Sequence, residues 1–456
     1  MVATWIASIV MLSGAQGGTS LLRQIVPSPT GINGYEDYLS AADAINDGQL
    51  DDYLSWSSHQ YQDYLNSFTP GPDMSPEEVR ELKAIKPDAQ KLARLKRLST
   101  MNFLEVRREA KKHYEKALQF LHRGSTKKAW DPRQKIVADT LMPEYTYFKS
   151  LAKLAKMASF AAFADGDTKE GTEILIDTLA LGYNLQNGIL ISNLVGTAIQ
   201  AIAMAAFERN LQNISVFDAK TIETRVGAML GGNPLIVDSI KREFQFSIDA
   251  FNDMLDKVES IISNQGVNDD LNAGLKQKLK SLTPAQKESL SQKLRSELMP
   301  KYQEIVAQFS KPESEWGKIN DQEEASPDET LANLNTPDQF VEYWSRNLLP
   351  VFGQVGQAAA KLRAQLRLLR LHAAVLRYKW ENGSMPKTLE DAVARKDTID
   401  PLNGQLFVYE QQPPWGFRIY SLGSPQLGQI ELKYRRPANF VPQDSGPVPP
   451  LLTAGP

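Results

Sequence analysis

The 456-residue sequence lacks cysteine, which excludes disulfide scaffolds, thiolate nucleophiles, iron–sulfur clusters and cysteine zinc sites. It also lacks a surplus of either charge, because 51 basic and 54 acidic side chains leave a net charge of −3. Without a basic surplus the chain has no global attraction for polyanions, which argues against a nucleic-acid partner. The missing cysteines do not identify the cellular compartment.

Catalytic motifs and histidines are scarce as well. The sequence has no HExxH, GxSxG, GxGxxG or GxxxxGK[ST] motif. Its four histidines are His59, His113, His122 and His372, and none stands three residues after a glutamate, as a di-iron bundle requires. We therefore predict no catalytic residue, no metal and no cofactor, and interpret each histidine as a surface or edge residue.

Long apolar runs are absent beyond residues 2–12, which are too few to span a bilayer, since a helix needs ~20 apolar residues. Small residues follow at Ala15 and Gly17, so residues 1–30 are predicted to be a signal or hydrophobic N-terminal segment, although a basic n-region is missing. This predicts export to the periplasm or cell envelope; the alternative is a buried or frayed N-terminus of a cytoplasmic protein. The proline-rich residues 437–456 are predicted to form an extended tail.

Helix-start signals recur along the chain, each with a capping residue, a proline and a Glu or Gln at the third helical position. They begin at Ser75, Asp131, Thr283, Ser326 and Thr336. They predict a mainly α fold, in which residues 31–350 form an irregular helical bundle or solenoid-like body without a 34-residue repeat. Polar segments near 263–274 and 311–327 are predicted to be loops.

Helical periodicity predicts three apolar stripes within this body. They comprise Leu151, Leu154, Ala155, Ala158, Ala162 and Phe163; Ile174, Leu175, Thr178, Leu179, Leu181 and Gly182; and Leu194, Ala198, Ile202, Ala205 and Ala206. The intervening segment 165–167 is predicted to be the turn of a helical hairpin. Although it has two carboxylates, residues 165–176 depart from the EF-hand pattern at three positions, so a turn is favoured over a metal site.

Charged residues cluster in two places. Six acidic residues are interpreted as solvated helix faces among half-buried tyrosines: Glu36, Asp37, Asp43, Asp47, Asp51 and Asp52. Segment 351–381 carries an apolar stripe and a basic side with Arg363, Arg367, Arg370 and Arg377. This side is a candidate surface for acidic protein or lipid headgroups; the alternative is pairing with carboxylates of neighbouring helices.

The C-terminal sequence changes character after that helix. It contains Asn382-Gly383-Ser384-Met385-Pro386, then Asp400-Pro401-Leu402-Asn403-Gly404, and later Tyr420-Ser421-Leu422-Gly423. Residues 351–436 thereby resemble the globular part of type II secretion major pseudopilins and type IV pilin-like proteins. The resemblance implies a small α+β module made of a long helix and a short antiparallel sheet. The prepilin-peptidase site and the acidic calcium-binding segment of such proteins are missing.

The combination of a helical body and this module also resembles large uncharacterised bacterial helical proteins, which implies no particular reaction. We predict a non-enzymatic scaffold or protein-interaction protein of the bacterial cell envelope, with protein partners. The alternative is an enzyme or small-ligand binder with a site between helices of the body, for which the candidates are Glu144, Tyr145, Tyr147, Glu173 and Asp177. Peripheral membrane contact through the four arginines is a third hypothesis.

Overall fold

The computed structural model describes residues 20–137, 139–231, 235–257, 273–318, 333–347, 352–412, 416–425 and 427–432. These residues form 17 α-helices and one three-stranded antiparallel sheet, which confirms a mainly α fold with a small C-terminal α+β part. The expectations for residues 1–17, for the cap at Ser326 and for the tail lie outside the described residues.

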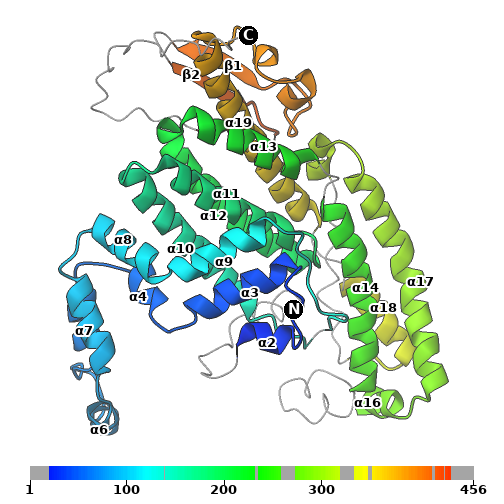
Figure 1. The fold of residues 1–456 in the computed structure, drawn as a ribbon. Coiled ribbons are helices and arrows are strands. Elements are labelled where there is room, and N and C mark those ends of the chain that lie inside the picture. The colour runs from blue at the N-terminus through cyan, green and yellow to red at the C-terminus, as the bar shows by residue number, and fades with distance from the viewer. Residues whose placement is uncertain are drawn as a thin grey trace.

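Three long helices occupy the centre of the molecule (Figure 1): α10 (Glu144–Ala164), α11 (Thr168–Leu185) and α12 (Leu190–Asn210). The predicted hairpin between α10 and α11 is confirmed, because Gly166 adopts a φ of 83° and Asp167 caps α11 by accepting from the Glu170 N–H at 2.9 Å. Helices α11 and α12 approach closely: a Cβ on Gly196 would lie 2.3 Å from the carbonyl oxygen of Gly182.

Three of the five residues of the third predicted stripe lie on the exposed face of α12. Leu194 is 40% exposed, and Ala198 and Ala205 are exposed too, whereas Ile199 and Phe207 are buried. Because this helix is apolar on nearly every side, periodicity could not choose its core face. The segment Leu190–Asn213 is long and apolar enough to cross a membrane, but 56% of that window is buried among other helices, as in the core of a globular protein.

Shorter helices from the N-terminal part of the sequence pack on the three central helices. Together they form a core rich in aromatic residues, including Tyr38, Tyr53, Tyr145 and Phe148. The shorter helices are α2 (Leu21–Ile25), α3 (Gly34–Ile45), α4 (Leu50–Leu54), α8 (Phe103–His113) and α9 (Glu115–Ser125). Helices α5 (Gln60–Asn66), α6 (Pro76–Ala84) and α7 (Ala89–Leu98) extend away from this core (Figure 1). We call residues 60–98 the arm.

After α12, helix α13 (Val216–Gly231) packs against α11 and α19. On the side of the molecule opposite the arm lie α14 (Leu235–Asp256), α16 (Ala273–Lys280), α17 (Pro284–Phe309) and α18 (Pro337–Asn347) (Figure 1). Full capping boxes at Ser75 and Thr283 are confirmed for α6 and α17, and Thr336 caps α18 by accepting from the Gln339 N–H at 3.2 Å.

One local prediction is wrong. No helix starts at Asp131, whose carboxylate accepts from the Arg133 N–H at 3.0 Å and so stabilises a turn instead. Of the loop expected over residues 311–327, the described part contains a 3-10 helix at Glu313–Lys318, which buries Trp316. Helix α16 begins at the end of the other expected loop, 263–274, and the remaining residues of both loops lie outside the described residues.

The C-terminal part begins with α19 (Phe352–Asn382), which ends as predicted at Gly383 with a φ of 66°. Strand β2 (Gly416–Ser421) lies between β1 (Val408–Gln412) and β3 (Ile430–Glu431), with Val408 opposite Tyr420. The carboxylate of Asp400 orders the turn before β1 by accepting from the Leu402 N–H and the Ser421 hydroxyl. Helix α19 packs on α13 and is buried on most sides, so one apolar core continues from the body to the sheet.

Candidate functional site

The four arginines predicted as a surface on α19 are half-buried and paired, which is the alternative that the sequence left open. Arg363 donates to Glu313 at 2.6 Å, Arg367 to the Ile399 carbonyl at 2.7 Å, Arg370 to Asp397 at 2.8 Å and Arg377 to Glu223 at 2.7 Å. The contacts tie α19 to α13, to the 3-10 helix at 313–318 and to the segment before β1. These side chains therefore stabilise the packing of the fold.

The predicted carboxylate and tyrosine group does not form one site. Fully buried Glu144 accepts from the Tyr35 hydroxyl at 3.0 Å and from Arg133 at 2.7 Å, while Tyr145 bonds to Ser192 at 2.5 Å. Burial raises the pKa of Glu144, and the Arg133 charge opposes that rise. Elsewhere on α10, the Tyr147 hydroxyl donates to the side chain of Asn46.

Asp177 forms a separate cluster between α9, α11 and α13. Its buried carboxylate contacts His122 Nδ1 at 2.8 Å, the Ser125 hydroxyl at 2.6 Å and Arg225 at 2.8 Å. The hydrogen bond to Asp177 raises the pKa of His122, and the nearby charge of Glu173 adds to that effect.

This cluster contains the residue types of a catalytic triad in the wrong order. In a triad the histidine lies between the serine and the acid, so that it can take the serine proton. Here Ser125 donates directly to Asp177, and the acid lies between the serine and His122. The arrangement can hold three helices together but does not activate Ser125 as a nucleophile. Among the described residues no group of three His, Asp or Glu side chains is placed to hold a metal ion.

A buried glutamate on α14 was missed by the sequence analysis. Glu243 accepts from the Leu190 N–H at 2.8 Å and so caps α12, whose own N-cap Ile189 has no side chain that could do so. Burial raises the pKa of Glu243 to about 7, and the Leu190 N–H opposes the rise. Ser239 and Ser247 lie one turn to either side of Glu243, and the three side chains form a polar seam along α14. The Ser239 hydroxyl donates to the Gln186 carbonyl, and the Ser247 hydroxyl forms a hydrogen bond with the Tyr302 hydroxyl.

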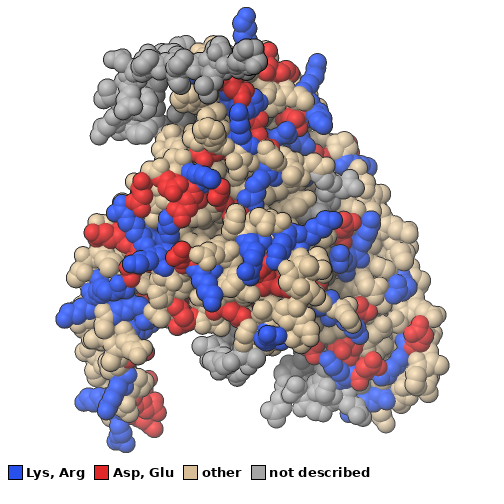
Figure 2. Space-filling view, in the orientation of Figure 1, with Lys and Arg blue, Asp and Glu red and all other residues tan. Residues whose placement is uncertain are grey.

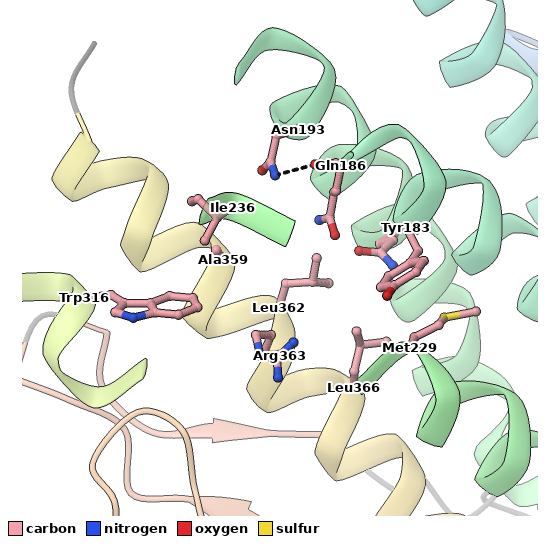
Figure 3. Close-up of a pocket in the computed structure, with 11 residues that line it drawn as sticks. Tyr183, Gln186, Asn193, Met229, Ile236, Trp316, Ala359, Leu362, Arg363 and Leu366 are labelled. Atoms are coloured by element: carbon pink, nitrogen blue, oxygen red, sulfur yellow. Dashed lines mark hydrogen bonds between the residues drawn. The ribbon is translucent and has the colours of Figure 1, made fainter. Parts of the chain in front are cut away.

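Next to this seam lies a small cavity between α11, α12 and α19 (Figure 3). Tyr183 and Gln186 face Leu362 and Arg363 across it, and its volume is about 30 Å³. A buried water needs roughly 10–15 Å³, and organic ligand pockets are roughly 300–1,000 Å³. The cavity therefore has room for a water molecule or two, which could satisfy the otherwise unpartnered side-chain oxygen of Gln200.

The arm is an extension whose tip, helix α6, buries none of its residues (Figures 1 and 2). Its base is anchored by fully buried Leu98 and by the ion pair of Arg94 with Asp52 at 2.6 Å. Helix α6 at the tip is amphipathic, with Val79 and Leu82 half-buried and Ile85, directly after it, 57% exposed. A partly exposed apolar helix face at the end of an extension is a candidate interaction surface.

Two further expectations are wrong. The acidic residues near the N-terminus are not simply solvated, because Glu36, Asp37 and Asp52 are buried and Asp37 pairs with Arg123 and Lys127. His372 is not a surface residue but lies in the core against Phe417, where burial lowers its pKa to about 4. His372 follows Leu371 and precedes Ala373 in a nearly unbroken apolar run, which was the available signal.

No family model, no curated protein and no solved structure matches this chain.

Proposed function

We propose that this protein is a non-enzymatic interaction scaffold that binds a protein partner through its arm. The observation that carries the proposal is helix α6, which is firmly capped by Ser75 and Glu78 yet buries no residue. A short helix of this kind gains little from packing on its own chain, so its apolar face is available to a groove on another protein.

Contacts between α5 and α7 hold the part of the arm that carries α6. The Tyr64 hydroxyl of α5 accepts from the Asp88 N–H at the start of α7 at 3.2 Å, and the Lys91 ammonium lies 5.1 Å from the Tyr64 ring. These contacts join the two helices that lead to and from α6. A preorganised element binds more tightly than a flexible one, because less conformational entropy is lost on binding.

We further propose that the C-terminal part is a pilin-like module and that the protein acts in the bacterial cell envelope. The order of a long helix, a glycine stop, a turn held by Asp400 and a small antiparallel sheet supports the first proposal. The apolar sequence of residues 2–12 supports the second.

The arm is tested by crosslinking from a photoreactive residue at Leu82 of the full-length protein in its native cells. We expect one defined protein to be captured, and capture to be lost when Val79→Asp and Ile85→Asp are introduced together. A matched control is Ile32→Asp, which alters an exposed isoleucine of the body. Capture that persists in the arm variant, or that the control abolishes equally, would contradict the proposal.

A further inference from the structure

Helix α10 packs on both α8 and α12, and a group of three cationic side chains takes one from each of these helices. They are Arg107 of α8, Lys156 of α10 and Arg209 in the last turn of α12. Arg107 and Lys156 are half-buried, and Arg209 is exposed. Because each residue comes from a different helix, only the tertiary packing assembles them.

The contacts of Arg107 fix the centre of this cluster. Its guanidinium carbon lies 4.0 Å from the ring centroid of Phe103 and 4.6 Å from that of Phe160. Phe160 lies one helical turn after Lys156, so Arg107 is held beside that lysine. Burial and the charge of Arg209 lower the pKa values of both Arg107 and Lys156, consistent with Arg209 lying near both.

Among the described residues no carboxylate forms an ion pair with any of these three side chains. The side chains acting on Arg107 and Lys156 are other cations, and Arg107 Nε is buried without a hydrogen-bond partner. By contrast, the half-buried Arg133, Arg225 and Arg363 each donate to a carboxylate. A cluster of unpaired, partly desolvated cations is costly unless an anion joins it.

We propose that Arg107, Lys156 and Arg209 form a binding site for a phosphate group. A phosphate carries up to two negative charges and several acceptor oxygens, so it suits three cations better than a single carboxylate does. The exposed apolar stripe of α12, with Leu194 and Ala205, leads along the helix to Arg209. The phosphate can therefore belong to a free anion or to a lipid headgroup, which present the same chemistry to the cations.

The site is tested by titrating the full-length protein with inorganic phosphate and pyrophosphate in a calorimeter at constant ionic strength. We expect Arg107→Gln, Lys156→Gln and Arg209→Gln each to weaken binding about tenfold or more, the effect of losing one charged hydrogen bond. The control is Arg242→Gln, an exposed arginine of α14. We also expect Lys156→Gln to keep or raise the melting temperature without phosphate, because it relieves repulsion.

A second arm uses phosphatidylcholine vesicles with and without phosphatidic acid. Binding of the free anions alone identifies a free phosphate ligand, and binding of the phosphatidic acid vesicles alone identifies a headgroup; either result supports the site if the three variants lose it. The proposal is overturned if neither probe binds, if Arg209→Gln binds as the wild type does, or if Arg242→Gln loses binding equally. Since Arg209 is exposed, its variant is informative even where a half-buried substitution prevents folding.

Discussion

Replacing Glu243 with glutamine should stabilise the protein at alkaline pH. The pKa of Glu243 is about 7 in the folded chain, against an ordinary value of 4.5. Between these values the folded chain keeps a proton that the unfolded chain releases, so the free energy of unfolding falls as pH rises. Each pKa unit between the folded and unfolded chains corresponds to about 1.4 kcal/mol, so the free energy of unfolding has fallen by about 3 kcal/mol once Glu243 is ionised in both states.

The Glu243→Gln side chain cannot ionise but can still accept from the Leu190 N–H that caps α12. If its amide group finds no acceptor, about 1 kcal/mol is lost. The expected net gain at pH 8 is therefore about 2 kcal/mol, and it should shrink to nothing or reverse near pH 4.

The assay is urea unfolding followed by circular dichroism at pH 5 and pH 8. Glu304→Gln is the control, because Glu304 is exposed on α17. The reasoning is refuted if Glu243→Gln is no more stable than the wild type at pH 8, or if its advantage is the same at both pH values.

Three further predictions use the same measurements or simple spectroscopy. The pKa of His372 is about 4 in the folded chain, against an ordinary value of 6.5, so between pH 6.5 and 4 the imidazole gains a proton only in the unfolded chain. The free energy of unfolding should therefore fall as the pH is lowered through this range, and His372→Phe should lose less stability than the wild type over the same range. Gly196→Ala should lower stability by about 1–3 kcal/mol in urea unfolding through overlap with the Gly182 carbonyl, whereas Gly231→Ala, with open space around it, should not. Asp177→Asn should lower the pKa of His122 in an NMR titration, and an unchanged value would contradict their hydrogen bond.

Local signals predicted much of the fold correctly. Caps at Ser75, Thr283 and Thr336, the turn at Gly166 and the stop at Gly383 are set by hydrogen bonds and backbone angles within a few residues, and each is found where expected. Asp131 shows the limit of such signals, because the same cap chemistry stabilises an isolated turn when no helix follows.

The candidate sites were harder to predict, because their members meet across long sequence distances. Arg377 pairs with Glu223 of α13, and Asp177 with Arg225 of the same helix. The sequence could identify the arginines of α19 but not the carboxylates that pair with them. It also could not show that Arg107 pairs with no carboxylate among the described residues.

The sequence by itself determined that the chain lacks cysteine, where several described helices start or stop, and that a small sheet follows the last helix, because these depend on composition and local backbone chemistry. Only the tertiary structure decided which face of α12 is buried, that His372 and Glu243 are in the core, and which charges are paired. Burial and long-range electrostatics depend on every neighbouring helix, so no single segment contains that information.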